Sequence, residues 1–130
     1  MEKEKIVQDP WARTTTRNGL AGDEVISALQ KSIRKGYEKE ACEFAYEMYI
    51  TSPQFEDKLW RRLLAISVED IGMGNPEAAV LIHSFNQMRQ EFQYNESDRL
   101  MFIIHAIRYL CQSEKDRSSD LLKNIIIKSF

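Results

Sequence analysis

The chain has 130 residues, of which 43% are hydrophobic and 29% charged, which is typical of one soluble globular domain. The 18 lysines and arginines stand against 20 aspartates and glutamates, and this net charge of −2 excludes a strongly basic nucleic-acid-binding coat. No GxxxxGK[ST], GxGxxG, HExxH or GxSxG motif occurs, which excludes the commonest enzymes that carry such motifs. An enzyme with a dispersed site is not excluded by this test.

The two cysteines, Cys42 and Cys111, are too few for a disulfide scaffold and stand among apolar residues. We expect both to be buried free thiols in a reducing cytoplasm. The charged start of the chain is followed by no apolar stretch of a signal peptide, and no apolar run approaches the roughly 18 residues of a membrane span. The sequence therefore predicts a cytoplasmic protein without membrane contact.

Residues 1–22 are predicted to form an N-terminal arm that is partly extended or disordered. Turn-forming residues are frequent there, and no continuous apolar face is present. Trp11 favours an arm that lies across a neighbouring surface, in this copy or in another. Residues 23–130 are predicted to form a helical domain.

In that domain apolar residues recur at helical spacing and almost never alternate. The first helix is predicted to begin at Asp23, as N-cap, and to end at Gly36. A second helix is expected from Tyr37 until Pro53 ends it, because proline cannot continue the hydrogen-bond ladder. The two helices would form a hairpin with a very short turn.

A third helix is predicted over residues 55–71, at the centre of the bundle. Apolar residues on more than half of a helix's circumference are typical of such a position; here they are Leu59, Trp60, Leu63, Leu64 and Ile66. Gly72 and Gly74 interrupt this helix. Asn75 and Pro76 then predict the start of the next one, as its N-cap and first residue.

Three further helices complete the predicted fold. The fourth presents either Met88 or Arg89 to the core, and a polar turn at 95–97 precedes the fifth. The sixth begins near Ser119. Its residues 125–130 are apolar on more than one face, which favours a partner surface, although a buried last helix would show the same pattern. The sequence predicts an all-α, compact bundle of five or six helices.

One segment resembles a known signature: residues 61–76 read RRLLAISVEDIGMGNP. This segment is similar to the C-terminal domain of the MgsA/RarA family of AAA+ ATPases, relatives of the Werner-helicase-interacting protein. Further similar segments occur in the family's order at residues 25–34, 40–48 and 100–116, so the resemblance covers about residues 23–125.

The resemblance implies the helical collar fold of clamp-loader-like proteins, assembly into a tetramer, and a role in DNA replication, recombination or repair. It does not imply ATP hydrolysis by these residues, because the family's ATPase core and lid have no counterpart among them. The residues that carry the structural signature are Arg61, Arg62, Glu69, Asp70, Gly72, Asn75 and Pro76.

Glu69 and Asp70 fall at the end of the predicted third helix, where the helix dipole disfavours negative charge. We expect one acid to lock the turn at 72–75, with the N-terminus of the next helix as one candidate for compensation. The other acid would face an arginine such as Arg62 or Arg61 in a bidentate pair.

No catalytic, cofactor or metal site is predicted. Glu69 and Asp70 would point about 100° apart on a helix, and no glutamate or histidine stands three or four residues away to complete a site. His83 and His105 lack the spacing of zinc ligands, and Ser67 lacks a visible base.

Lys31, Arg34 and Lys35 share one helix face, which Arg61 and Arg62 would extend. The candidate contact residues for DNA or a partner are Lys31, Arg34, Lys35, Arg13, Arg17 and Trp11. A solvated face paired with nearby glutamates is the alternative interpretation.

The leading hypothesis is a non-enzymatic oligomerisation or protein-interaction module without a cofactor. It would bind itself, with a tetramer favoured, or a separate AAA+ ATPase. The alternative is a DNA-binding accessory protein that uses the basic helix face.

Overall fold

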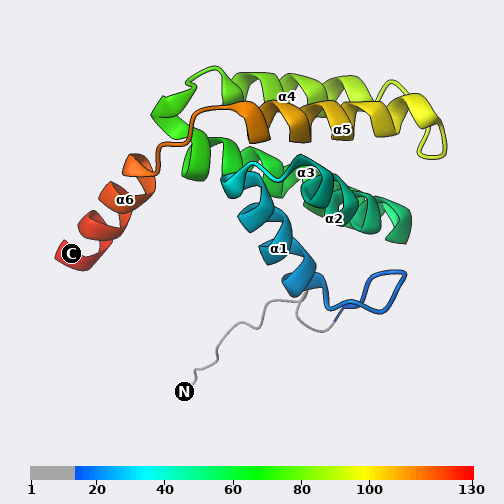
Figure 1. Cartoon of the computed structure of the whole chain (residues 1–130), viewed down its shortest axis with the longest axis horizontal. Helices are drawn as coiled ribbons and strands as arrows, with labels where there is room; N and C mark the ends of the chain where they lie inside the picture. The colour runs from blue at the N-terminus through cyan, green and yellow to red at the C-terminus, as the bar shows by residue number, and fades with distance from the viewer. Residues whose placement is uncertain (1–13) are drawn as a thin grey trace.

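A computed structural model describes residues 14–130, and the regular secondary structure within that range is helical throughout. The predicted all-α bundle is confirmed (Figure 1). In chain order the elements are α1 (Gly22–Lys35), α2 (Glu38–Thr51), α3 (Pro53–Ile66), the π-helix η2 (Ser67–Ile71), the 3₁₀-helix η3 (Gly72–Gly74), α4 (Ala78–Arg89), α5 (Ser97–Gln112) and α6 (Ser118–Ser129).

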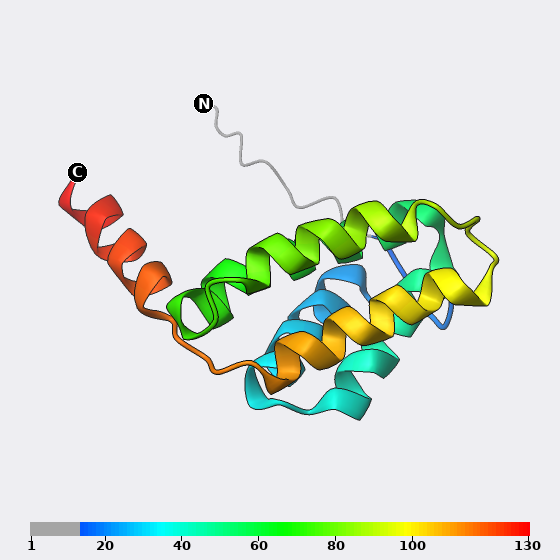
Figure 2. The same cartoon turned by 90° about the horizontal axis from the view of Figure 1, so that it is seen from above.

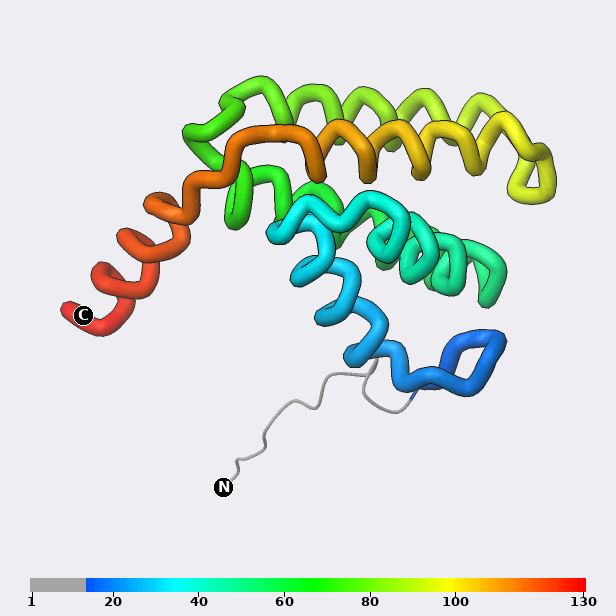
Figure 3. The backbone as a smooth tube through the Cα atoms, in the orientation of Figure 1, coloured from blue at the N-terminus to red at the C-terminus, as the bar shows by residue number. Residues whose placement is uncertain are grey.

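The helices α1 to α5 pack in layers. The helices α4 and α5 run side by side along one face, and α2 and α3 lie beneath them (Figures 1 and 2). The helix α1 packs mainly against α2 and also touches α5 and α3. The tube in Figure 3 shows that α6 leaves this body at one end and extends away from it.

The helix α3 supplies the centre of the core, as predicted. Leu59, Leu63 and Ile66 are completely buried, and Trp60 is only 1% exposed. The prediction was wrong for Leu64, which is 39% exposed because it lies on the outer face of α3. The opposing layer contributes buried side chains of α5, namely Ile103, Ala106, Ile107 and Leu110.

A buried ion cluster joins α3 to α4 and α5. The carboxylate of Glu56 is fully buried, and it lies 2.8 Å from Arg99 and 3.2 Å from Arg89. Arg89 also stacks 5.7 Å from the centre of the Trp60 ring. Of the two predicted alternatives, Arg89 faces the core and Met88 does not. The reason is that the buried carboxylate of Glu56 needs positively charged partners, which Arg89 and Arg99 supply.

The helices α1 and α3 begin at other residues than predicted. The N-cap of α1 is Ala21, and Asp23 lies inside the first turn, where a carboxylate still suits the helix dipole. The helix α3 begins at Pro53, two residues before the predicted start, because the Ser52 hydroxyl accepts a hydrogen bond from the amide of Phe55 at 3.1 Å.

The described part of the predicted arm lies against α2. The carboxylate of Glu47 accepts a hydrogen bond from the Thr16 hydroxyl at 2.5 Å. It accepts two more from Asn18, one from the backbone amide at 2.9 Å and one from the side-chain amide at 2.6 Å. Burial raises the pKa of Glu47, but these donors outweigh it and hold the pKa below its ordinary value. Trp11 and Arg13 lie outside the described residues, so their predicted roles stay predictions.

Candidate interaction surfaces

The two glycines of the signature lie under the connector between α5 and α6. Gly72 has a φ of +50°, and a Cβ on it would lie 2.8 Å from the carbonyl oxygen of Asp116. A Cβ on Gly74 would collide with the backbone of Glu114. The backbone amide of Asp116 also donates to the carbonyl of Asp70 at 2.9 Å. Glycine is therefore required at both positions so that this connector can approach the turn closely.

Asp70 joins three parts of the chain. Its side chain is fully buried and accepts hydrogen bonds at 2.8 Å from Arg34 and from Gln30, both on α1. The guanidinium of Arg117, just before α6, lies 3.5 Å from the same carboxylate. Asp70 thus fixes α1, η2 and the start of α6 relative to one another. Glu69 is less buried and accepts a hydrogen bond from Gln30 at 2.9 Å.

The prediction that Arg62 or Arg61 pairs with Glu69 or Asp70 was wrong. Arg61 is exposed, and the one hydrogen bond of the Arg62 side chain among the described residues goes to the side chain of Gln30, at 3.5 Å. The arginines that face Asp70 come from distant positions, Arg34 and Arg117. No local spacing indicates such a pair, because the packing of α1 against η2 decides it.

Asn75 does not cap a helix, contrary to the prediction. Its side-chain amide donates to the Tyr109 hydroxyl at 2.7 Å and to the Ser113 hydroxyl at 3.1 Å. The helix α4 begins three residues later, at Ala78. Asn75 and Pro76 therefore form a turn that attaches the start of α4 to the end of α5.

The other candidate residues with reactive or metal-binding side chains are Ser67, the two cysteines and the two histidines. The hydroxyl of Ser67 is buried and donates to the carbonyl of Leu64 at 2.6 Å. Burial raises the pKa of Cys111 to about 12, which keeps it a thiol, and Cys42 is half-buried instead of fully buried as predicted. His83 and His105 are exposed on α4 and α5. Within residues 14–130, no group of three or more histidine, cysteine, aspartate or glutamate residues could hold a metal ion.

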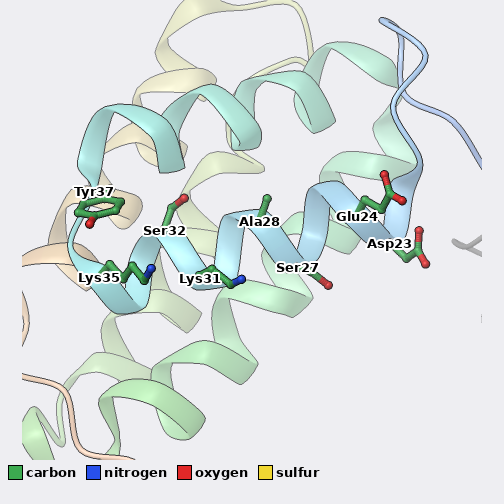
Figure 4. A pocket seen from close by; sticks show the side chains of 8 residues that line it. All are labelled: Asp23, Glu24, Ser27, Ala28, Lys31, Ser32, Lys35 and Tyr37. Atoms are coloured by element: carbon green, nitrogen blue, oxygen red, sulfur yellow. The ribbon is translucent and has the colours of Figure 1, made fainter.

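The predicted basic face on α1 is divided. Arg34 forms an ion pair with the buried Asp70, and the Lys35 ammonium lies 6.0 Å from the centre of the Tyr37 ring. Lys31 and Lys35 line a shallow groove of about 470 Å³ whose other end carries Asp23 and Glu24 (Figure 4). The charge of this groove is mixed, which weakens its attraction for a polyanion.

A second basic group lies on the outer face of α3. Lys58, Arg61 and Arg62 line a groove of about 460 Å³ that continues over Ala65 and Val68. A further groove, of about 250 Å³, shares these last two residues and is completed by the start of α6. Basic and apolar surface therefore adjoin along α3.

The helix α6 exposes the largest group of apolar side chains in the described chain. None of its residues is buried, and its five large apolar side chains, together with Phe130 directly after its end, are between 49% and 104% exposed. They are Leu121, Leu122, Ile125, Ile126, Ile127 and Phe130. Such surface marks a binding face in soluble proteins.

The described residues thus define an all-α domain whose candidate site is a surface and not a pocket with convergent polar groups. Over 105 residues, 81% of the chain, the sequence is 32% identical to replication-associated recombination protein A of Bacillus subtilis (strain 168). The matched part is 24% of the length of that relative. No protein-family profile matches the chain.

This similarity gives partial support to the resemblance to the MgsA/RarA family. The assignment to the C-terminal domain of that family stays a prediction. No helix within residues 14–130 combines the length and the apolar composition needed to cross a membrane.

Proposed function

We propose that the chain is a non-enzymatic assembly module in DNA replication, recombination or repair. It binds further copies of itself, with a tetramer favoured, or a separate AAA+ ATPase, and it has the collar-like fold of clamp-loader proteins. The observation that carries this proposal is the exposed apolar face of α6. The name of the Bacillus subtilis relative supports the association with replication and recombination.

Exposed apolar side chains gain free energy when they leave water. Each large aliphatic side chain gains roughly 1.5–3 kcal/mol when it is fully buried. Five such side chains of α6, and Phe130 directly after it, remain largely in solvent. A chain with so much apolar surface on one short helix gains free energy by association, which supports a binding function.

The polar side chains of the signature support the same proposal. Asp70 and Asn75 use their hydrogen-bonding groups inside the fold, where they connect α1, η2, α5 and the start of α6. Asp70 therefore acts on the placement of α6, and Asn75 acts on the packing of the segment before α4 against the end of α5. A structural role of this kind requires no reacting group.

The test is the solution mass, measured by light scattering after size exclusion at two protein and two salt concentrations. We expect a multiple of the 15.2 kDa chain, with four copies favoured, and no ATP hydrolysis by the purified chain. A chain that stays at 15.2 kDa at every concentration, and that also fails to bind the Bacillus subtilis relative in a pull-down, would contradict the proposal.

DNA binding is the second candidate, because the fold brings two basic groups to neighbouring helices. Arg62 on α3 contacts Gln30 on α1 at 3.5 Å, and Lys31 follows Gln30 directly. Arg61 and Lys58 continue the basic surface along α3. Lysine and arginine side chains in such a row suit phosphate contacts.

This second candidate is tested by the fluorescence anisotropy of a labelled 20-base-pair duplex. The Lys31→Glu/Arg61→Glu variant should lose at least about tenfold in affinity and should show a shallower salt dependence. Lys39→Glu, a charge reversal at an exposed lysine on α2, is the matched control. Equal affinity of the double variant and the control would exclude this face as the DNA site. Arg34 is left intact, because it pairs with the buried Asp70.

A further inference from the structure

The helix α6 turns its polar side toward the body of the protein. The side chain of Asp120 is only 10% exposed and forms ion pairs of 3.2 Å with Arg117 and with Lys123. Asp120 and Lys123 also line the groove of about 250 Å³ together with Ala65 and Val68 of the α3–η2 segment. The contacts of α6 with the body are mainly with η2 and η3. This orientation is the reverse of that of an ordinary surface helix, which places its apolar side against the core.

The apolar side of α6 consequently faces solvent. At about 100° per residue, Leu121, Ile125, Leu122 and Ile126 occupy successive positions over an arc of roughly 140°. They are 49–62% exposed, and Phe130 extends the same side beyond the last turn. The views in Figures 1 and 2 show that this helix lies clear of α1–α5 along most of its length. Within residues 14–130, this side of α6 is therefore left uncovered.

The size of the face matches what association of two copies requires. The five side chains on this side of α6, namely the four in the arc and Phe130, each offer on the order of 100 Å² of accessible surface. If this side of one copy covers the same side of a second copy, the two together bury roughly 1,000 Å², which reaches the approximate minimum of 1,000 Å² for a specific interface. A two-fold axis places the same apolar residues opposite each other, so one face supplies both halves of the interface.

Charge and arc width favour another copy of the chain as the occupant. Asp120 and Lys123 lie on the side of α6 opposite the apolar arc, and Lys128 lies at its edge, about 20° from Leu121, so two apolar sides can meet with charge only at the rim of the contact. The net charge of −2 produces little repulsion between copies. An arc of about 140° exceeds the roughly 100° stripe that suffices for packing on one surface, so it also has room for α6 helices from more than two copies.

We infer that α6 is the self-association element of this chain and that its apolar side packs against α6 of a second copy. The inference rests on the proposed assembly function and specifies its surface. Asp70, through Arg117, holds the start of α6 so that the apolar side points outward.

The first test compares solution masses. Leu122→Asp/Ile126→Asp places two carboxylates in the proposed interface, and we expect the assembled mass of the parent chain to fall to that of the 15.2 kDa monomer. Met101→Asp is the matched control, because Met101 is an equally exposed apolar residue, at 62%, on α5. The control should keep the parent mass. Circular dichroism checks that both variants remain helical.

The second test is geometric. Ile126→Cys should give a disulfide-linked dimer under mild oxidation, with at least about tenfold more product than Met101→Cys; both variants retain Cys42 and Cys111 as an internal background. The assembly should also persist when salt is raised from 0.1 to 1 M, since apolar contacts are not screened.

The outcomes separate this inference from the function on which it rests. An assembled parent chain whose mass survives Leu122→Asp/Ile126→Asp would overturn the α6 contact and leave the assembly function in place. A parent chain that stays monomeric at every concentration would overturn the α6 contact as well. In that case, binding of the Bacillus subtilis relative decides whether an assembly function remains.

Discussion

The helices α5 and α6 are both amphipathic, but their apolar sides have opposite surroundings. In α5 the side chains of Ile103, Ile107 and Leu110 are completely buried. In α6 the side chains of Leu122 and Ile126 are about half exposed. Both helices show apolar residues at helical spacing, so periodicity states only that a helix has an apolar side. Whether that side is covered within the chain depends on the direction in which the preceding connector sends the helix.

The connectors explain the difference. The chain reverses through a loop between α4 and α5, which brings the apolar sides of the two helices together (Figure 2). Before α6, in contrast, the connector is fixed over the glycine turn by the bond from the Asp116 amide to the Asp70 carbonyl. The ion pairs of Arg117 then hold the polar side of α6 inward. Burial of apolar side chains therefore holds α1–α5 together, whereas polar contacts hold the start of α6.

The largest loss in the free energy of unfolding is expected for Trp60→Ala. Trp60 is 1% exposed at the centre of α3 and lies against the Arg89 guanidinium. We expect a loss of about 3–5 kcal/mol in the free energy of unfolding, because a large cavity would remain. Urea denaturation followed by circular dichroism measures it. A loss below about 1 kcal/mol would show that α3 is not the central helix.

The Asp70→Ala variant tests the polar fixation between body and α6. It leaves Arg34 and Arg117 without their shared carboxylate, but both arginines are more than a third exposed and can regain water. We therefore expect a smaller loss, about 1–3 kcal/mol, and a lower melting temperature. Hydrogen exchange should also become faster in residues 114–120. Asp70→Asn, which keeps an acceptor, should lose less, and an unchanged melting temperature in Asp70→Ala would refute the role of this carboxylate.

A pH titration tests the contact of residues 14–21 with α2. The pKa of Glu47 in the folded chain lies below the ordinary value of 4.5, so its contribution is complete above about pH 4.5 and is lost as the pH falls through the folded pKa. We expect a loss of about 1 kcal/mol in acid. Glu47→Gln should already be less stable at pH 7 and should lose this part of the acid sensitivity. Melting temperatures of both proteins between pH 7 and pH 3 measure the difference.

The smallest effect is expected for Ile126→Ala on α6. Because Ile126 is 49% exposed and touches no core, the free energy of unfolding of the dilute chain should change by less than about 0.5 kcal/mol. Ile107→Ala on α5, at a completely buried position, should lose about 2–5 kcal/mol in the same assay. Equal losses in the two variants would mean that α6 is covered within the chain.

Much of the body could be predicted from the sequence. Residues such as Leu59 and Trp60 recur at helical spacing, and Pro53 and Gly72 interrupt the chain where elements change. These are local signals, because they depend on backbone geometry and on the side of one helix. The start of α4 was missed because Asn75 has its partners, Tyr109 and Ser113, more than thirty residues away.

The candidate surface shows the same division. The apolar composition of residues 125–130 was visible in the sequence, and so was a partner surface as one of its two interpretations. The inward position of Asp120 was not visible, since it depends on the path of the connector over η2 and η3. The basic face was also changed by the fold, because Arg34 joins Asp70.

The sequence by itself determined that the chain is an all-α bundle and which side of each core helix is apolar, since helical periodicity is written into neighbouring residues. Only the tertiary structure decided which apolar sides are covered and which arginines meet the buried acids Glu56 and Asp70. The physical reason is that burial and charge pairing join residues 30 to 50 positions apart, such as Arg34 with Asp70 and Arg117 with Asp70. Contacts of that range follow from the packing of whole helices, and no local spacing encodes them.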